Sequence, residues 1–553
     1  MAKKLKKAFT ITELVIVIAV IAILAAVLIP TFSNVINRAN ESADIQAVRE
    51  MNIALDNAEA LNGKPTSVSE AMDILAADNL DARGYRALAK NHAILYHLGE
   101  NIVVYLNTST YEIEYPEGLS ITYSETTLGN WYNLDGRMEG DNTWQQESEN
   151  NPVKTSADIA SLRADDAVPS AVIKEGDNII GAKVDTAAKL VAVAEYLETL
   201  DNYGEGFTLI LGADMDMSNS QWKPISEYRG SFYGNNHTIS NLEISDFTAE
   251  AKAYSAATPD TSYYYYGFIS VFSGSYFGNV KFENIVIDRP GHTANIGTGS
   301  SRNNHTVGGA IGGIVVPAEY YGPEHTVTVE NVTVSGTIHA YSRGGGIVGY
   351  IGGYNGSNDL SQSQMECTVN IRGCTNNSTI TTDVQVSNAT IGGILGTTNQ
   401  RKASSEINIT TCVNTGNLTG HRTGGIVADV HGSGAEGLGV STGTINISDC
   451  TNSGAITSYG DGAGGIYGYF QLYSYCFDVT ITGCQNTGAL QNTANSANVG
   501  NMFGATSSIS ENGHKINLNM SGNKTADGAV GATDSDVTNA SYNGSILWDT
   551  ITA

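Results

Sequence analysis

The chain has 553 residues, and its 29 Lys and Arg residues against 56 Asp and Glu residues give a formal net charge of −27. Nucleic-acid binding needs a basic footprint, so this composition excludes nucleic acid as a partner of the main body. Only 15% of the residues are charged and 61 are Gly, which is typical of an exported β-rich chain, and the length predicts two or three domains.

The N-terminus combines a basic leader, one acidic residue and an apolar run. Four lysines within residues 3–7 precede Ala8 and Phe9, and the sixteen residues 14–29 are all apolar. As a helix this run is about 24 Å long, so we expect a single-pass membrane segment. Because a charge is costly in lipid, Glu13, directly before the run, is expected to be functional and to have a partner.

The same segment resembles the type IV prepilin signal of pilins and pseudopilins. If Phe9 is the first mature residue, Glu13 is fifth and Pro30 is twenty-second, as in that family, although Ala8 stands where the family usually has Gly. An ordinary secretory signal would continue into a polar region with small residues, whereas this run continues into Pro30 and a helix pattern. A plain membrane anchor has no reason to keep Glu13, so the prepilin interpretation is favoured.

The resemblance implies how the chain is processed and assembled. A prepilin peptidase/methyltransferase would cleave between Ala8 and Phe9 and N-methylate the new terminus, with the basic leader kept cytoplasmic. The protein would be a single-pass membrane protein before assembly, and afterwards part of an extracellular filament on the cell surface. Glu13 would pair with the Phe9 amine of another pilin subunit, and Pro30 would kink the helix.

A long helix and a small head are expected next. Apolar residues recur at helical spacing as far as the helix-ending sequence Asn-Gly-Lys-Pro at 62–65, which predicts a stem helix over 9–62. One short helical stretch and four strand-like segments then predict a small α+β pilin head. These segments are 67–79 for the helix and 92–98, 100–107, 111–116 and 119–124 for the strands.

Residues 126–180 are polar and poorly periodic, and we expect a linker or irregular connection there. An amphipathic helix pattern then starts at Asp185. From about residue 305 a sequence motif built around Gly-Gly-Ile recurs along the chain. The later copies of this motif are each preceded by a second motif with alternating β-branched residues. The central apolar residues of the first motif are Ile314, Ile347, Ile394, Ile426, Ile466 and Met502, at intervals of 33, 47, 32, 40 and 36.

A fixed pair of motifs with variable spacers predicts a right-handed parallel β-helix. Together with the segment Trp222–Ile244, the repeats resemble the β-helical domains of bacterial surface proteins with GLUG-type motifs, over roughly residues 185–530. That resemblance implies a fold and no particular activity. The expected architecture is an α+β pilin module, with a long N-terminal helix and a small β head, followed by an all-β right-handed parallel β-helix solenoid.

The expected segments are a prepilin leader (1–8), a transmembrane and stem helix (9–62), an α+β head (63–125), a linker (126–180), the β-helix (181–530) and a C-terminal tail or cap (531–553).

Four of the six cysteines occupy the same place in successive repeats, where the repeat before them has Val332. A position that accepts either Val or Cys is expected to be apolar and to face the core. We therefore expect these cysteines to form a column of buried free thiols. Cys367 and Cys476 lie outside this column, and a local disulfide stays open for each. The four equivalent cysteines are Cys374, Cys412, Cys450 and Cys484.

An asparagine follows each of these four cysteines by two residues. Stacked Asn side chains can hydrogen-bond along a β-helix turn, and we expect a structural ladder in preference to a binding site. The four residues are Asn376, Asn414, Asn452 and Asn486.

Candidate ligand-facing residues are the consecutive tyrosines Tyr263, Tyr264, Tyr265 and Tyr266. Exposed tyrosines can stack on sugar rings, although strand-edge tyrosines more often just cover a face of the solenoid, and the pattern favours that alternative. The cysteines lack zinc spacing, and Asp214 and Asp216 are typical of alternate strand residues more than of a calcium site. We therefore expect no metal, no cofactor and no catalytic residue.

The sequence favours a type IV pilus-like filament subunit, as a minor or tip pilin, that displays its β-helix for adhesion or surface recognition of a host or environmental glycan or protein. One alternative is a β-helix polysaccharide lyase or hydrolase anchored by a pilin stem. Lys and Arg are scarce between 305 and 530, which weighs against a lyase. Another alternative is a pseudopilin of a secretion or DNA-uptake machine, whose head is usually small.

Overall fold

The computed structural model comprises two compact units, residues 1–136 and residues 137–553. Each unit is described by itself. For residues 11–36 the description is limited to the backbone. The described residues are 11–524, except 66–67, 78–79, 81–86, 90–91, 108–109, 111, 122, 124–130, 134–136, 139–141, 146–153, 165–167, 219–221, 245–263, 289–304, 317–324, 354–366, 383–388, 400–404, 433–442, 473–476, 495–498 and 507–515.

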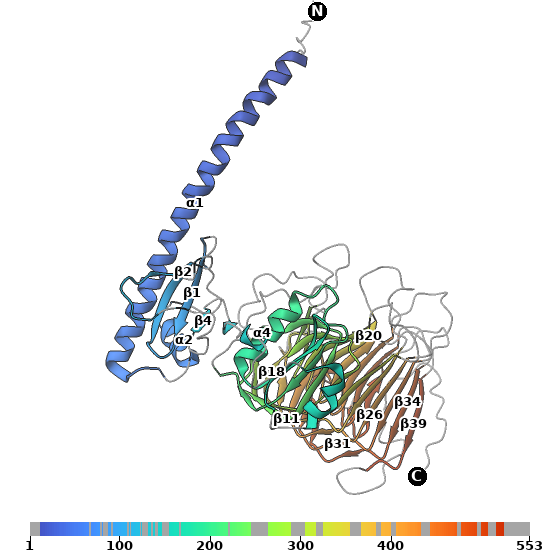
Figure 1. Ribbon diagram of the computed structural model, residues 1–553. Coiled ribbons are helices and arrows are strands. Elements are labelled where there is room, and N and C mark those ends of the chain that lie inside the picture. The colour runs from blue at the N-terminus through green and yellow to red at the C-terminus, as the bar shows by residue number, and fades with distance from the viewer. Residues whose placement is uncertain are drawn as a thin grey trace, which may run out of the picture. The chain divides into compact units, whose positions relative to one another are not determined.

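The first unit is built on one long helix, α1 (Ile11–Asn62), of 52 residues. At about 1.5 Å per residue it is about 78 Å long, and its N-terminal part extends past the rest of the unit (Figure 1). The helix ends where Gly63 adopts a φ of +88° and donates its N–H to the carbonyl of Glu59 at 2.9 Å. A left-handed glycine at this position satisfies the last carbonyl groups, so the helix end predicted at Asn62 is confirmed.

An antiparallel sheet with the strand order β3-β2-β1-β4 packs with α1 and the short helix α2 (Val68–Ala77). Leu95, Val104 and Trp131 lie in its core, each at most 2% exposed. The strands are β1 (His92–His97), β2 (Ile102–Asn107), β3 (Glu112–Tyr115) and β4 (Trp131–Asn133). The sheet therefore continues past residue 125, and the described residues between 119 and 124 form no strand, contrary to expectation.

The stretch 126–180, expected to be a linker, contains several regular elements besides β4. Its tryptophans explain why: Trp131 lies in the core of the first unit and Trp144 in the core of the second. Two apolar anchors of this size fix the surrounding chain despite its polar composition. The elements are β5 (Arg137–Met138), η1 (Asn142–Gln145), η2 (Ser156–Asp158), α3 (Ile159–Ala164), β6 (Ala171–Glu175) and β7 (Asn178–Val184), which ends just beyond the expected linker.

Helix α4 (Ala187–Glu198) lies at the N-terminal end of the solenoid (Figure 1). Thr186 caps it by accepting a hydrogen bond from the Lys189 N–H, as the sequence pattern predicts for a helix start. Leu190, Val193 and Leu197 are buried against the first coil. The helix thus covers the end of a stack whose apolar interior would otherwise meet water.

The rest of the second unit is a stack of parallel strands, which agrees with the predicted β-helix; its right-handedness stays a prediction. One parallel sheet has eight strands. In order they are β10 (Ile225–Tyr228), β14 (Ile269–Phe272), β17 (Ile311–Val316), β20 (Val348–Gly353), β25 (Leu395–Asn399), β29 (Val427–Gly432), β33 (Tyr467–Leu472) and β38 (Phe503–Thr506).

The remaining strands of the coils pair in parallel in the same way, coil on coil, to close the solenoid. The first stretch of each coil is formed by β8 (Thr208–Leu211), β11 (Ser231–Ser240), β15 (Tyr276–Ile287), β18 (Thr326–His339), β21 (Thr368–Arg372), β26 (Glu406–Thr410), β30 (Thr444–Ser448), β34 (Phe477–Thr482) and β39 (Ile516–Ser521).

Short strands continue these coils towards the eight-stranded sheet. They are β9 (Met215–Asp216), β12 (Glu243–Ile244), β13 (Tyr264–Tyr266), β16 (His305–Gly308), β19 (Arg343–Gly345), β22 (Thr375–Asn376), β23 (Thr379–Thr381), β24 (Thr390–Gly392), β27 (Val413–Asn414), β28 (Leu418–Gly424), β31 (Thr451–Asn452), β32 (Ile456–Gly464), β35 (Gln485–Asn486), β36 (Leu490–Asn492) and β37 (Val499–Gly500).

From Ile347 onward the repeated Gly-Gly-Ile motifs form the turns before the last five strands of the eight-stranded sheet, and their central residues stack in the core. Ile347 donates its N–H to Ile394 at 3.2 Å, and Ile394 to Ile426 at 3.0 Å. In the coil before these the predicted register is wrong. Ala310 donates to Ile347 at 3.2 Å and occupies the place assigned to Ile314, which pairs with Ile351 instead.

The predicted column of buried thiols is confirmed. Cys374, Cys412, Cys450 and Cys484 are all free and 0% exposed, and Val332 is likewise 0% exposed. Cys367 is also a buried free thiol, so it forms no local disulfide, whereas Cys476 lies outside the described residues.

The predicted asparagine ladder is confirmed too. Each Asn Nδ2 donates to the Oδ1 of the next rung, from Asn376 to Asn414 (2.7 Å) and from Asn452 to Asn486 (2.8 Å). The ladder ends where Asn486 donates to Asn501 at 3.1 Å. These rungs hold the same turn together in successive coils.

Candidate functional site

The residues expected to direct processing and assembly lie at the N-terminus. Ala8 and Phe9 are outside the described residues. Glu13 and Pro30 lie within α1, where the description covers the backbone and not their side chains. Their roles therefore stay predictions.

The C-terminal half of α1 is fixed to the rest of its unit by buried polar contacts. Both carboxylate oxygens of Asp44, which is 0% exposed, accept backbone N–H groups, from Leu88 and Ala89, each at 2.9 Å. Asn52 pairs with the backbone of Val103 in both directions, donating at 2.8 Å and accepting at 2.7 Å. Because these bonds are charge-assisted or paired and at least partly buried, they join the helix firmly to β2 and to the segment before β1.

The expected single-pass membrane location is contradicted. Among the residues that the structure describes, no helix combines the length and the apolar character needed to cross a bilayer.

Of the four candidate tyrosines, the structure describes the side chains of Tyr265 and Tyr266. Tyr263 lies outside the described residues, and Tyr264 belongs to β13 without a described side chain. Tyr265 and Tyr266 are each 3% exposed, so the expectation that they face a ligand is wrong. Tyr266 lies in the main core, and Tyr265 points to the opposite side of the strand, where its ring centroid is 5.8 Å from that of Tyr350. Alternating strand residues are thus covered on both faces.

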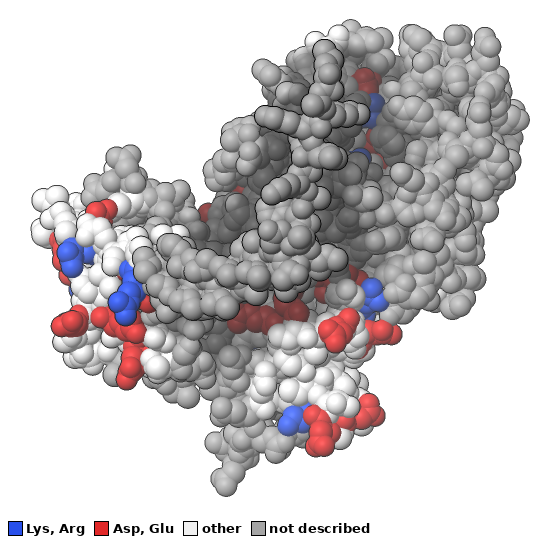
Figure 2. Space-filling model, turned by 90° about the horizontal axis from the view of Figure 1, so that it is seen from above, with Lys and Arg blue, Asp and Glu red and all other residues white. Residues whose placement is uncertain are grey.

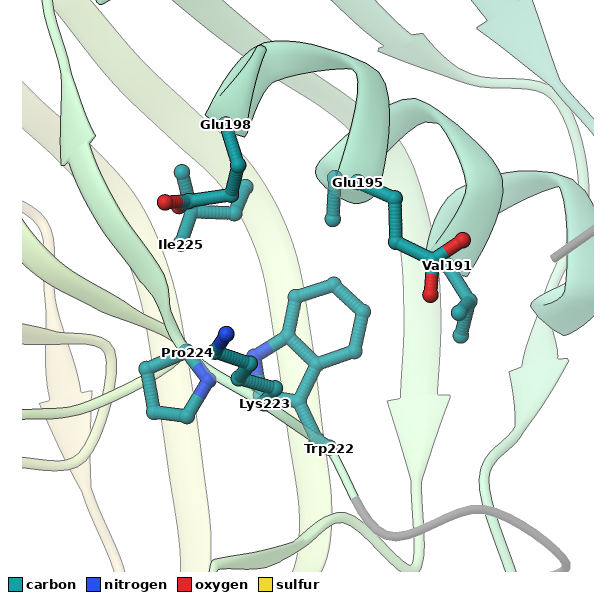
Figure 3. Close-up of a pocket in the computed structure, with 8 residues that line it drawn as sticks. Val191, Glu195, Glu198, Trp222, Lys223, Pro224 and Ile225 are labelled. Carbon is teal, nitrogen blue, oxygen red and sulfur yellow. The ribbon is translucent and has the colours of Figure 1, made fainter. Parts of the chain in front are cut away.

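A small, partly open depression lies where α4 meets the segment before β10 (Figure 3). Glu195 and Glu198 of α4 lie on one side of it, with Trp222 and Lys223 on the other. Trp222 is 3% exposed and donates its Nε1–H to the carbonyl of Phe268 at 2.9 Å.

Glu198 accepts both the N–H and the hydroxyl of Ser226, each at 2.6 Å. These hydrogen bonds join α4 to the first coil, and the depression lies between the joined parts.

A buried ion cluster lies deeper in the solenoid and was missed by sequence reasoning. Arg422 of β28 is 3% exposed; its Nη1 donates to Asp429 at 3.0 Å and its Nε to Asp461 at 2.7 Å. Its guanidinium carbon lies 4.3 Å from the ring centroid of Tyr469. Burial alone would lower the pKa of Arg422, but the two carboxylates raise it above its usual value, so the side chain keeps its charge.

The local strand geometry creates this cluster. The register between β28 and β32 shifts at Gly420/Arg422, which brings Asp461 beside Arg422 from the next coil. Asp429 reaches it from β29, across the tight turn of the same coil. The arrangement clamps two coils together. The one sequence signal for it is an Arg four residues before the central Ile of the Gly-Gly-Ile motif, and Arg343 repeats it two coils earlier.

The described charged side chains are otherwise dispersed. Figure 2 shows acidic side chains outnumbering basic ones on the described part of one face, as the composition indicates. In the part of the chain that is described, no three His, Cys, Asp or Glu side chains come together in a way that could hold a metal ion.

Comparisons with known proteins give no family. No protein-family description and no curated protein matches the chain. A solved protein from Bacteroides ovatus, named as a candidate immunoglobulin A1 protease, is similar with 19% sequence identity and a TM-score of 0.35. The similarity covers 66% of this chain and 82% of the solved one. A likeness at this level carries no argument about fold or activity.

Proposed function

We propose that the chain is a subunit of a type IV pilus-like filament, in a minor or tip position, and that its β-helix serves adhesion or recognition of a glycan or protein. The observation that supports this best is the construction of α1. The helix is continuous over 52 residues, and its described hydrogen bonds to the rest of its unit lie between Asn40 and Glu59. A long N-terminal part therefore extends past the head, available to pack with other helices.

Assembly would use the N-terminal part of α1. After a prepilin peptidase/methyltransferase removes residues 1–8, the Phe9 amine of one subunit would pair with the Glu13 carboxylate of another. An opposite charge at close range in a dry helix bundle compensates a carboxylate that would otherwise be costly to bury. The hydrogen bonds of Asp44 and Asn52 would then hold the head in a fixed position relative to the helix.

The size of the second unit favours a minor or tip position. Residues 137–553 form a body about three times as long in sequence as the first unit. A body of this size on every subunit would crowd a continuous shaft, whereas a sparse or terminal position leaves room for it.

Filament incorporation tests the proposal. In cells that make the filament, Glu13→Ala should remove the chain from the purified filament fraction while its total amount stays unchanged. Glu50→Ala is the matched control, because Glu50 is an exposed carboxylate on the same helix. Mass spectrometry of the mature protein should find N-methylated Phe9. Normal incorporation of Glu13→Ala, or an intact leader, would overturn the proposal.

A further inference from the structure

One outer face of the solenoid carries side chains in register from coil to coil. Along β18, β21, β26, β30 and β34, apolar residues face the core and the alternate polar residues face outward. Adjacent coils are about 4.8 Å apart, so each outward position forms a regular column. The middle column consists of Tyr276, Thr328, Asn370, Asn408, Asn446 and Thr480. We call the three columns of these strands the amide–hydroxyl face.

The amides of the middle column are held in fixed orientations. Asn446 donates from Nδ2 to the Oδ1 of Asn408 at 2.9 Å, and Asn408 donates in the same way to Asn370 at 3.0 Å. Each of these bonds uses one of the two N–H groups of an amide. Asn446 donates its other N–H to Glu406, so the amide groups that remain for a ligand include the second N–H of Asn408 and the remaining lone pairs of the column. Because these amides are already held in place, a ligand that binds them has little side-chain entropy to remove.

The face carries few charges: Glu330, Glu406 and Asp478 are its acidic residues and Arg372 is its basic one. Its charged residues at the N-terminal edge, Glu330 and Arg372, form an ion pair with each other. Glu406, in a flanking column, accepts a hydrogen bond from Asn446 at 3.2 Å. The outward positions of Thr410, Ser448 and other flanking residues carry hydroxyl groups. With a net charge of −27 on the whole chain and more carboxylates than cations on this face, an anionic ligand would be repelled from the protein.

An aromatic ring begins the middle column. Tyr276 is half-buried, and its ring stacks on that of Tyr233 with 4.5 Å between centroids. Its hydroxyl donates to Glu330 at 2.8 Å, which fixes the ring. An immobilised tyrosine offers apolar surface together with a polar edge. Beyond it the column offers amide and hydroxyl groups and no large apolar anchor, which is unlike the aromatic-rich centre of a protein–protein interface.

We propose that the amide–hydroxyl face binds an extended neutral polysaccharide laid across the coils, with Tyr276 at one end of the chain and the Asn370–Asn408–Asn446 column along it. Repeating uncharged hydroxyls on the ligand match repeating uncharged donors and acceptors on the protein. The inference deepens the proposed recognition role and rests on it.

Affinity electrophoresis of the full-length chain tests the inference, with laminarin, mannan and dextran as neutral probes and polygalacturonate as the anionic one. At least one neutral probe should retard the protein, and polygalacturonate should not. Asn408→Asp replaces the N–H donor by a charged acceptor, so its affinity should fall at least tenfold. Asn417→Asp is the matched control: Asn417 is exposed in the same coil and uses its Oδ1 to accept the Ala455 N–H at 3.1 Å, a bond that Asp keeps.

Thr410→Ala leaves the amide column intact and should weaken binding of the neutral polysaccharide severalfold. If Asn408→Asp fails to fold, the affinity of Thr410→Ala still tests the inference. Retardation by polygalacturonate alone, no retardation by any neutral probe, or equal affinity of wild type and folded face variants would overturn the inference. The filament test separates the two proposals. A chain that binds the polysaccharide but stays out of filaments refutes only the filament role, and a chain in filaments without polysaccharide binding refutes only this inference.

Discussion

Asn414 donates a hydrogen bond from its Nδ2 to the Oδ1 of Asn452, 2.7 Å away in the next coil of the solenoid. The same Nδ2 also reaches the carbonyl of Gly416 in its own turn, at 3.0 Å. Both asparagines are 0% exposed. Each amide thus ties its own turn and links it to the next, which explains why the residue recurs and why it is not available to a ligand.

Asn452→Ala should lower the free energy of unfolding of the solenoid by about 2–3 kcal/mol, because buried partners in two coils lose their hydrogen bonds. Urea denaturation followed by tyrosine and tryptophan fluorescence would measure the loss. Asn446→Ala is the control, since it breaks a similar Asn–Asn bond on the outer face, where water can replace it, and should cost less than about 1 kcal/mol. Equal losses would contradict the structural role of the inner ladder.

Arg422→Ala should destabilise the solenoid by about 3–5 kcal/mol, because it leaves the carboxylate of Asp429, which is 0% exposed, buried without its cation. The double variant Arg422→Met/Asp429→Asn should recover part of the loss, since it removes the buried charge as well. Thermal unfolding monitored by circular dichroism would rank the variants.

Arg372→Ala serves as the control for this cluster. Arg372 pairs with Glu330, but its side chain is 56% exposed, and exposed pairs contribute about 0–1 kcal/mol. If Arg372→Ala and Arg422→Ala shift the melting temperature equally, the buried cluster does not clamp the coils.

The sequence predicted features that repeat and missed features that occur once. The Cys and Asn columns could be predicted because the same residue in the same motif of successive coils has to face the same way. Arg422 could not, because its burial depends on Asp429 across a turn and on Asp461 brought in by a local register shift.

The misplaced register at Ile314 has a related cause. Residues 308–314 contain two Gly-Gly pairs, and sequence alone favoured the second because Ile follows it directly. The backbone pairing shows that the first pair, Gly308 and Gly309, forms the turn. Gly308 pairs with Gly345, and a Cβ on Gly308 would lie 1.8 Å from the carbonyl oxygen of Ile311, so only glycine fits this turn. Ala310 fills the core position with a smaller side chain.

The buried thiols should be unreactive in the folded protein. Burial raises the pKa of Cys367 to about 12, and the hydrogen bond with Cys374 together with burial raises the pKa of Cys412 well above its usual value. Since the thiolate is the reactive form, Ellman's reagent at pH 8 should label these thiols only after denaturation. Rapid labelling of Cys412 or Cys450 in the native protein, located by mass spectrometry, would contradict the burial of the column.

The same thiols predict a loss of stability at alkaline pH. The folded pKa is raised for Cys367, Cys412, Cys450 and Cys484. Above the unfolded pKa of about 8.5 the unfolded state therefore releases protons that the folded state keeps, and the free energy of unfolding falls as pH rises. The loss is about 1.4 kcal/mol per thiol one pH unit above that value.

Cys450→Val should reduce this pH dependence by one proton while preserving the fold, because Val332 fills the equivalent position three coils earlier. Urea midpoints between pH 7 and pH 10 would measure both effects, and an unchanged slope in Cys450→Val would contradict the assignment.

Asp44→Asn should loosen the attachment of α1 to its sheet. The carboxylate accepts one backbone N–H on each oxygen, and an amide can keep only one of these bonds, so one buried N–H loses its partner at a cost of about 1–3 kcal/mol. Hydrogen exchange should show faster exchange at residues 44–62 of α1 and at Leu88 and Ala89. Asp56→Asn is the control, since Asp56 is exposed on the same helix and its variant should exchange like wild type. If both variants exchange alike, the carboxylate of Asp44 does not hold the helix, and a rigid connection from filament to head would need another origin.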